Sequence, residues 1–261
     1  MGRIIAVANQ KGGVGKTTTA INLAASLAAA ERKVLAVDCD PQGNLTSGLG
    51  RKTKDEDRPS LYDVLLGGRS LEEVLLATDL EHLSLVPADR NLTGAEVELV
   101  PLLAREFRLK EALAAVAPRF DYVLLDCPPS LGLLTVNALT AAQSVLVPLQ
   151  CEYFALEGIT ELMATMRRVQ RALNPELEVL GVLLTMVDER MNLTQQVMGD
   201  IRTHFKEKVF KATVPRSVRL AEAPSFGKPV ILYDVRSKGA EAYLDLAKEL
   251  MAHDQLPLFA R

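Results

Sequence analysis

A glycine-rich turn links the first apolar run of the chain to an alanine-rich helical segment. The run Ile4–Ala8 predicts a strand, and the turn that follows it reads Gln10-Lys11-Gly12-Gly13-Val14-Gly15-Lys16-Thr17-Thr18-Thr19. A turn from a strand into a helix N-terminus directs several backbone N–H groups and the helix dipole at one spot. The segment therefore predicts a site for phosphate groups at the start of the helix.

The residue types in this turn suit a nucleoside triphosphate and Mg²⁺. Lys16 can reach the β- and γ-phosphates, and the Thr17 hydroxyl can bind Mg²⁺. The strict pattern GxxxxGK[ST] is not met, because Gln10 stands where its first glycine belongs. The alternative is a loop rich in glycine for turn geometry alone. We expect nucleotide contacts from one continuous set of residues: Lys11, Gly12, Gly13, Val14, Gly15, Lys16, Thr17 and Thr18.

Short β-branched runs alternate with helical patterns along the whole chain. We expect strands at Ile4–Ala8, Val34–Asp38, Leu83–Val86, Tyr122–Asp126, Val145–Leu149 and Val179–Val187. We expect helices at Lys16–Ala30, Leu61–Leu66, Gly94–Val116, Leu133–Ala142, Ile159–Leu173 and from about Gly239 to Ala252. This order predicts an α/β fold with one doubly wound, mainly parallel sheet flanked by helices. The charged stretch Arg51–Pro59 is the clearest loop, and no linker divides residues 1–261, so we expect a single domain.

Composition excludes several classes of protein. The chain has 261 residues, 48% hydrophobic and 24% charged, which is typical of a globular protein and not of a disordered or coiled-coil chain. Cys39, Cys127 and Cys151 have no CxxC spacing, so we expect buried reduced thiols and no zinc site. The N-terminus lacks a secretory apolar region, and no stretch is apolar enough to span a lipid bilayer. We therefore expect a cytoplasmic protein.

Acidic residues follow two of the predicted strands. In a parallel sheet, ligands collect at the carboxyl ends of strands, so these acids should lie beside the phosphate loop. Asp126 ends an apolar strand, where an Asp can hold a Mg²⁺-bound water. Asp40 opens a Pro/Gly turn and can approach a bound nucleotide; the alternative is a residue that only closes the turn. Asp38 should face away from Asp40, in a supporting or a structural role.

Several blocks of sequence, in the right order, resemble the ParA/MinD family and within it the chromosomal ParA/Soj partition ATPases. The KGGVGKT segment is similar to the deviant Walker A signature of that family. The other blocks that carry the resemblance are DPQGNLTSGLG, DCPPSLGLLTVNAL, PLQCEYFALEG, GVLLTMVDER and VPRSVRLAEAPSFGKPVILYD. Because the chain begins at its first strand, it resembles the short chromosomal type, which lacks an N-terminal helix-turn-helix region.

The resemblance implies roles that the residue pattern alone does not. It implies an ATPase that uses Mg²⁺, dimerises around ATP, and has Lys11 reaching across to the partner's nucleotide; the alternative for Lys11 is a solvated loop lysine. It assigns the orientation of the attacking water to Asp40. It also implies base contacts from Pro215 and Ser217, although many relatives have Asn at the position of Ser217.

A basic region in the C-terminal half predicts DNA binding. From Arg190 to Lys238 there are ten Lys and Arg residues against four acids, a local charge of +6 in a chain of net charge −3. Such a face suits phosphate-backbone contacts without base reading, and the alternative is chance clustering on a solvated surface. The resemblance implies nonspecific binding of duplex DNA by the ATP dimer, with Arg190 and Arg219 as contacts. It further implies a ParB-type partner that stimulates hydrolysis, and association with the nucleoid.

Three other functions share parts of this pattern. A MinD-type membrane-positioning ATPase needs a basic amphipathic C-terminal helix, and the tail His253–Arg261 contains Pro257 and one basic residue. An iron–sulfur reductase needs free cysteines at a dimer axis, whereas Cys39 and Cys127 each adjoin a site acid. A sister ATPase that positions another cargo would share every motif, so the leading hypothesis remains a DNA-partition ATPase.

Overall fold

The carboxyl ends of parallel strands meet at one edge of a central sheet. The computed structural model describes residues 2–51, 58–152, 155–188 and 190–253, with the backbone alone at 155–158. The strand order is β3-β4-β2-β5-β1-β6-β7-β8, and every pairing except β3 with β4 is parallel. The strands are β1 (Arg3–Val7), β2 (Val34–Asp38), β3 (Leu76–Ala77), β4 (Leu83–Val86), β5 (Tyr122–Asp126), β6 (Ser144–Gln150), β7 (Glu178–Val187) and β8 (Val209–Pro215).

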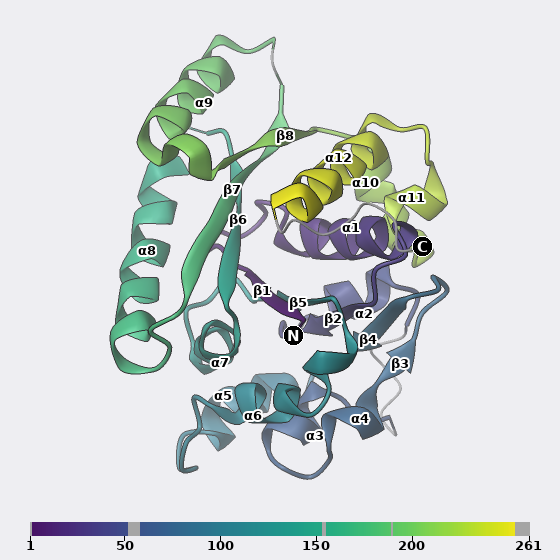
Figure 1. Cartoon of the computed structure of the whole chain (residues 1–261), viewed down its shortest axis with the longest axis vertical. Coiled ribbons are helices and arrows are strands. Elements are labelled where there is room, and N and C mark those ends of the chain that lie inside the picture. The colour runs from purple at the N-terminus through teal and green to yellow at the C-terminus, as the bar shows by residue number, and fades with distance from the viewer. Residues whose placement is uncertain (1, 52–57, 153–154, 189, 254–261) are drawn as a thin grey trace.

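Helices cover both faces of this sheet, as the sequence predicts (Figure 1). They are α1 (Lys16–Ala29), α2 (Asn44–Gly48), α3 (Leu61–Leu65), α4 (Leu71–Val74), α5 (Leu92–Glu98), α6 (Arg108–Ala114), α7 (Leu133–Ala141), α8 (Ala155–Ala172), α9 (Asn192–Phe205), α10 (Val218–Glu222), α11 (Val230–Tyr233) and α12 (Lys238–His253). Three short 3₁₀ helices are η1 (Ala117–Arg119), η2 (Lys206–Lys208) and η3 (Ala223–Phe226). The fold is thus a doubly wound, mainly parallel α/β sheet.

Two apolar cores lie on opposite faces of the sheet because successive strand residues point to opposite sides. In β1, Ile5 and Val7 pack with α1 and α12, whereas Ala6 packs in the other core with α5, α6, α7, α8 and α9. The central strands β2 and β5 are buried along their whole length. Their continuous apolar sequence reflects this burial on both faces.

The prediction of a single helix over Gly94–Val116 is wrong. The structure has α5 and α6 there, separated by the turns of residues 99–107. Pro101 lacks an N–H and disfavours helical backbone at Val100, so the helix ends just before it. Ala104 then takes a left-handed conformation, with φ of 52°, and the chain restarts in α6.

The sequence pattern did not predict the strands β3 and β8 or the helices α2, α4, α9, α10 and α11, nor the three short 3₁₀ helices. Strand β8 lies at the edge of the sheet and alternates buried residues such as Phe210 and Val214 with exposed Lys211. This alternation is weaker than the continuous apolar runs of the central strands. Of the predicted loop Arg51–Pro59, residues 52–57 lie outside the described part of the chain.

The order of the strands brings the predicted site residues together. Asp38 at the end of β2 is the register partner of Asp126 at the end of β5, and Val7 at the end of β1 is also level with Asp126. The glycine-rich turn leaves from the end of β1. Three segments far apart in sequence therefore meet at one edge of the sheet. In the described part of the chain, each helix is too short or too polar to span a lipid bilayer.

Candidate nucleotide-binding site

The glycine-rich turn wraps around an open space at the start of α1. Gly13 and Gly15 take left-handed conformations, with φ of 74° and 90°, which other residues adopt only with strain. A Cβ atom built at Gly12 or Gly13 would meet nothing within 4 Å, so this side of the loop is open to a ligand. The carbonyl of Val14 accepts a hydrogen bond from the Thr185 hydroxyl at 2.8 Å, which fixes the loop to β7.

The two lysines of the loop have different surroundings. Lys16 is 7% exposed, and its Nζ donates to the carbonyl of Lys11 at 3.0 Å. Burial lowers the pKa of Lys16, while the charges of Asp126 and Asp40 oppose that change. Lys11 is half-exposed, and its Nζ pairs with the Glu152 carboxylate at 2.7 Å. Lys16 is therefore positioned inside the site, whereas Lys11 lies at its rim.

Asp126 is the least satisfied group in the site. Its side chain is fully buried, and among the described residues neither carboxylate oxygen has a partner with regular hydrogen-bond geometry, although the Thr17 hydroxyl lies close enough to lower its pKa. Burial, with a further contribution from the charge of Asp38, raises the pKa of Asp126 well above its usual range, and Thr17 and Lys16 oppose the rise. A buried carboxylate without partners is costly unless a cation or its waters satisfy it.

The acids after β2 divide into a structural and a site-facing residue. Both oxygens of Asp38 are used: Oδ2 accepts from the backbone and hydroxyl of Thr46, at 2.8 and 2.6 Å, and Oδ1 accepts from Asp40 N at 3.2 Å. Burial raises the pKa of Asp38 to about 7. Asp40 is 7% exposed and accepts only from Gln42 N, at 2.9 Å, among the described contacts of its carboxylate. Asp38 therefore supports the turn that places Asp40.

These residues fit a nucleotide with Mg²⁺. A hydroxyl and a carboxylate are oxygen donors of the kind that Mg²⁺ prefers, and Thr17 and Asp126 supply them beside the phosphate loop. The open glycines, the helix N-terminus and Lys16 suit the phosphates. Thr18 lies in the first turn of α1, where its carbonyl accepts from Asn22 Nδ2 at 2.7 Å. The predicted phosphate and metal residues are thus assembled in one place.

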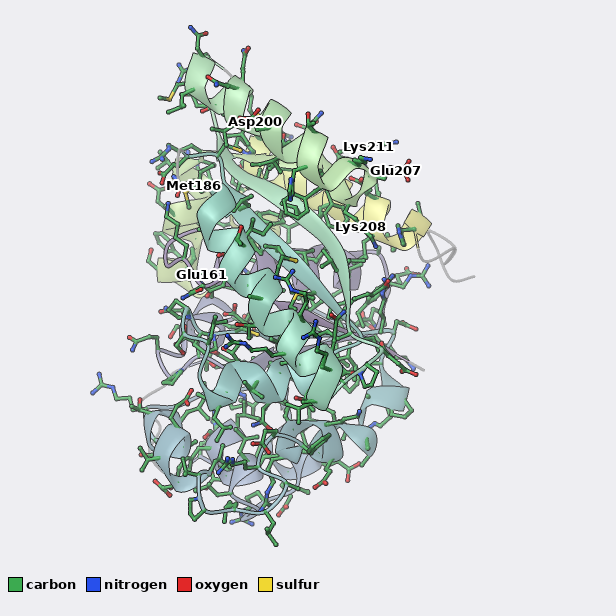
Figure 2. All side chains as sticks on the ribbon, turned by 90° about the vertical axis from the view of Figure 1, so that its left-hand side faces the viewer. Glu161, Met186, Asp200, Glu207, Lys208 and Lys211 are labelled. Carbon is green, nitrogen blue, oxygen red and sulfur yellow. The ribbon has the colours of Figure 1, made fainter. Side chains whose placement is uncertain are left out.

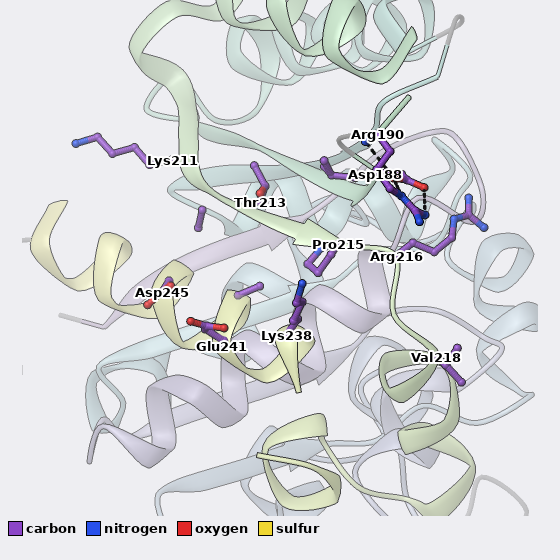
Figure 3. A pocket seen from close by; sticks show the side chains of 13 residues that line it. Asp188, Arg190, Lys211, Thr213, Pro215, Arg216, Val218, Lys238, Glu241 and Asp245 are labelled. Carbon is purple, nitrogen blue, oxygen red and sulfur yellow. Dashed lines mark hydrogen bonds and ion pairs between the residues drawn. The ribbon is translucent and has the colours of Figure 1, made fainter. Parts of the chain in front are cut away.

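The residues predicted to contact the base lie beyond β7, at the end of β8. Pro215 ends β8 and Ser217 precedes α10. Pro215 borders a hollow of about 820 Å³ between β7, β8 and α12, which Figure 3 shows from close by. Other residues that line it are Asp188, Arg190, Lys211, Arg216, Lys238, Glu241 and Asp245. Ser217 is not among them.

The basic region is not a uniform positive surface. Arg190 is 89% exposed on its side chain, yet its guanidinium pairs with Asp188 through two hydrogen bonds of 2.8 and 2.7 Å (Figure 3). Arg219 pairs with Glu222 at 3.1 Å and with Asp234 at 3.2 Å. The acid Asp200 lies on α9, and Glu207 stands between Lys206 and Lys208 in η2; Figure 2 labels Asp200, Glu207 and Lys208. The region carries positive charge in excess, with acids interleaved.

Three residues with a role at the site were not predicted from the sequence. Thr185 buttresses the phosphate loop, Glu152 holds Lys11, and Glu96 bonds the first turn of α7. Each lies far from its partner in sequence, so no local motif marks it. The cysteines are free and buried, as expected, and the described residues contain no cluster of His, Cys, Asp and Glu suited to a metal.

Known proteins share both the sequence and the fold. A family model described as an AAA domain matches residues 2–179. The chain is 59% identical to the chromosome partitioning protein ParA of Myxococcus xanthus, over 97% of this chain and 89% of that protein. It is 56% identical to the sporulation initiation inhibitor protein Soj of Bacillus subtilis, over 97% of this chain and all of that one.

A solved structure with bound ADP and magnesium has the same architecture. It is described as cobyrinic acid a,c-diamide synthase from Mycobacterium smegmatis, and it is 40% identical with a TM-score of 0.86 over the full length of both chains. The identity to the partition proteins is higher and extends over nearly the whole chain. The chain therefore belongs to the ParA/Soj family of chromosome-partitioning P-loop ATPases.

Proposed function

We propose that residues 1–261 form one ATPase domain that hydrolyses ATP to drive chromosome partition. The observation that carries this proposal is the buried carboxylate of Asp126, which has no regular hydrogen-bond partner in the described part of the chain, beside an open glycine loop and Lys16. Phosphoryl transfer to water depends on placing the reactants and neutralising charge, and this set of groups does both. The ADP and magnesium named for the solved relative support the same ligands here.

Each residue of the site has a distinct role in this proposal. The backbone of Gly12–Thr18 and the ammonium of Lys16 bind the phosphates, while Pro215 and Ser217 contact the base. Thr17 and, through water, Asp126 hold Mg²⁺, which neutralises phosphate charge when bound. Asp40 accepts a hydrogen bond from the attacking water and orients it. Its free acceptor capacity and its position beside Lys16 support that role.

ATP binding produces a sandwich dimer in the proposed cycle. Lys11 leaves Glu152 and contacts the phosphates of the partner's ATP. An exposed ion pair of this kind costs about 1 kcal/mol or less to break, so the exchange is cheap. The dimer binds duplex DNA without sequence preference through Arg190 and Arg219 of both subunits. A ParB-type protein then stimulates hydrolysis and releases the dimer from the nucleoid in the cytoplasm.

The membrane-positioning alternative has no support among the described residues. The tail on which it depends, residues 254–261, lies outside them. The name of the solved relative indicates a synthase, but that protein is less similar to this chain than the partition proteins are. Partition is therefore the function that the comparisons and the site support best.

Substitution of Asp40 tests the hydrolytic mechanism. Asp40→Ala should bind ATP with normal affinity and still dimerise, while hydrolysis falls about 100-fold or more, because the water loses its acceptor. The matched control is Asp79→Ala, an exposed acid in the turn between β3 and β4. Normal hydrolysis by the Asp40 variant would refute the assigned role.

A further inference from the structure

A carboxylate on α5 holds the helix that follows the loop after Asp126. Glu96 Oε2 accepts from the backbone N–H of Leu133 at 2.7 Å, and Oε1 accepts from that of Leu134 at 3.3 Å. The first N–H groups of a helix have no partner within the helix. The residue before α7 is Gly132, which has no side chain with which to cap the helix. Glu96 therefore supplies from another helix the cap that α7 lacks.

The segment between Asp126 and α7 is short and stiff. Pro128 and Pro129 each fix one backbone angle, and the Thr135 hydroxyl closes the loop by donating to the carbonyl of Ser130 at 2.6 Å. At the other end, Cys127 N donates to the carbonyl of Val7 at 3.2 Å. The loop therefore links the start of α7 directly to the end of the strand that carries Asp126.

Gly132 shows how closely Glu96 fits the start of α7. A Cβ atom on Gly132 would lie 2.5 and 2.6 Å from the two carboxylate oxygens of Glu96. The backbone of Gly132 has φ of −77° and ψ of −168°, which alanine also adopts. A methyl group on residue 132 would therefore displace the Glu96 carboxylate without straining its own backbone.

A second contact holds the same helix from the same side. Asn137 on α7 is buried; its Nδ2 donates to the carbonyl of Arg105 at 2.8 Å, and its Oδ1 accepts from Leu109 N at 3.2 Å. Asn137 ties the middle of α7 to the segment between α5 and α6. This contact should hold α7 against the protein when Glu96 is removed. Substitution of Glu96 should therefore change the position of the start of α7 more than the stability of the folded chain.

We propose that Glu96 is a positioning residue for ATP hydrolysis, which acts by holding α7 and, through residues 127–132, the carboxylate of Asp126. This inference rests on the proposed ATPase function. Glu96 touches neither nucleotide nor metal in this account. Its loss leaves ATP affinity intact and reduces turnover, because Asp126 is then held less accurately beside Thr17.

The experiment compares single and double variants of the full chain by steady-state ATP hydrolysis at increasing ATP concentrations. Glu96→Ala should lower kcat about tenfold, with KM for ATP within about twofold, because small misplacements near reacting groups are costly. Glu96→Gln retains a hydrogen-bond acceptor, so its kcat should fall by about threefold only. The matched control is Glu98→Ala, two residues along the same helix, whose carboxylate accepts from the hydroxyl of Tyr62; it should hydrolyse ATP at the wild-type rate.

A double substitution separates positioning from general loss of structure. Gly132→Ala alone should lower kcat as Glu96→Ala does, because its methyl group displaces the Glu96 carboxylate. In the Glu96→Ala background, Gly132→Ala should have no further effect, since the group it displaces is absent. Additive losses would overturn the inference, as would a Glu96→Ala variant with the kcat of the Glu98→Ala control.

The inference and the proposed function fail in different ways. If the wild-type chain does not hydrolyse ATP, the proposed function is wrong and the inference falls with it. If the wild type hydrolyses ATP and the Glu96 variants lose turnover only in proportion to a lower melting temperature, the positioning role alone is wrong. Glu96→Gln and Gly132→Ala supply this test even if Glu96→Ala does not fold.

Discussion

The nucleotide edge of the sheet and the basic region around β8 differ in how their residues are held. At the nucleotide edge, Lys16, Asp40 and Asp126 are buried: Lys16 begins α1, Asp40 lies just after β2, and Asp126 ends β5. In the basic region, Arg190 and Arg219 are exposed and paired with neighbouring acids. Burial fixes the geometry of the residues at the nucleotide edge. The basic region is defined only by its excess of positive charge. Substitutions should accordingly have large, specific effects at the edge and graded effects in the basic region.

The largest effect is expected at Lys16. Lys16→Ala removes the ammonium group that we propose binds the phosphates, so hydrolysis should fall by about 100-fold or more. Isothermal titration with ATP should also show weakened binding, which distinguishes this variant from Asp40→Ala. Lys248→Ala, an exposed lysine of α12 paired with Asp245, is the control. Equal ATP affinity in the Lys16 variant and the control would contradict the assigned role.

A smaller effect is expected for the arginines of the basic region. Arg190→Glu and Arg219→Glu should each weaken binding to random-sequence duplex DNA about tenfold and reduce the salt slope by about 1. ATP hydrolysis without DNA should be unchanged, because neither residue lies at the nucleotide edge. Arg69→Glu, near α4 on a different part of the surface, is the control. DNA binding that is equally weak in all three variants would remove the specific role of Arg190 and Arg219.

The pH dependence of stability should come from the buried acids of the edge. Because the pKa of Asp38 in the folded, nucleotide-free protein is raised to about 7, the folded state binds a proton that the unfolded state releases above pH 4. The free energy of unfolding should therefore fall as pH rises from about 4 to about 7, by about 2 kcal/mol or more. Urea unfolding at several pH values measures this slope.

Asp38→Asn tests which group causes that slope. Its unfolding free energy should vary less over the same pH range, although loss of the Thr46 bonds lowers its overall stability. Asp79→Asn should retain the wild-type slope. The attribution to Asp38 fails if its Asn variant keeps the full pH dependence.

The smallest effect is expected for the ion pair at the rim. Glu152→Gln removes the partner of Lys11, but both side chains are partly exposed, so the free energy of unfolding should change by about 0.5 kcal/mol or less. Thermal unfolding should shift by about 1 °C. A loss of several degrees would show that Lys11 is held more firmly than an exposed pair allows.

Local sequence signals predicted the edge well and the rest of the molecule less completely. The glycine turn, Lys16 and the strand ending in Asp126 are each recognisable within a few residues. Thr185, Glu152 and Glu96 are not, because each acts on a partner brought near only by the fold. Strand β8 was not predicted because an edge strand buries only alternate residues. The break between α5 and α6 was not predicted because the apolar residues continue with helical spacing on both sides of Pro101.

We expect ATP to gate binding of this protein to DNA, and a series of nucleotide states and salt concentrations measures that gating. Affinity for random-sequence duplex DNA is measured with ATP, with ADP and without nucleotide, at increasing salt concentrations. Binding should occur with ATP alone and should weaken steeply as salt rises, because phosphate contacts release counterions. Equal binding in all three nucleotide states, or none in any, would contradict it.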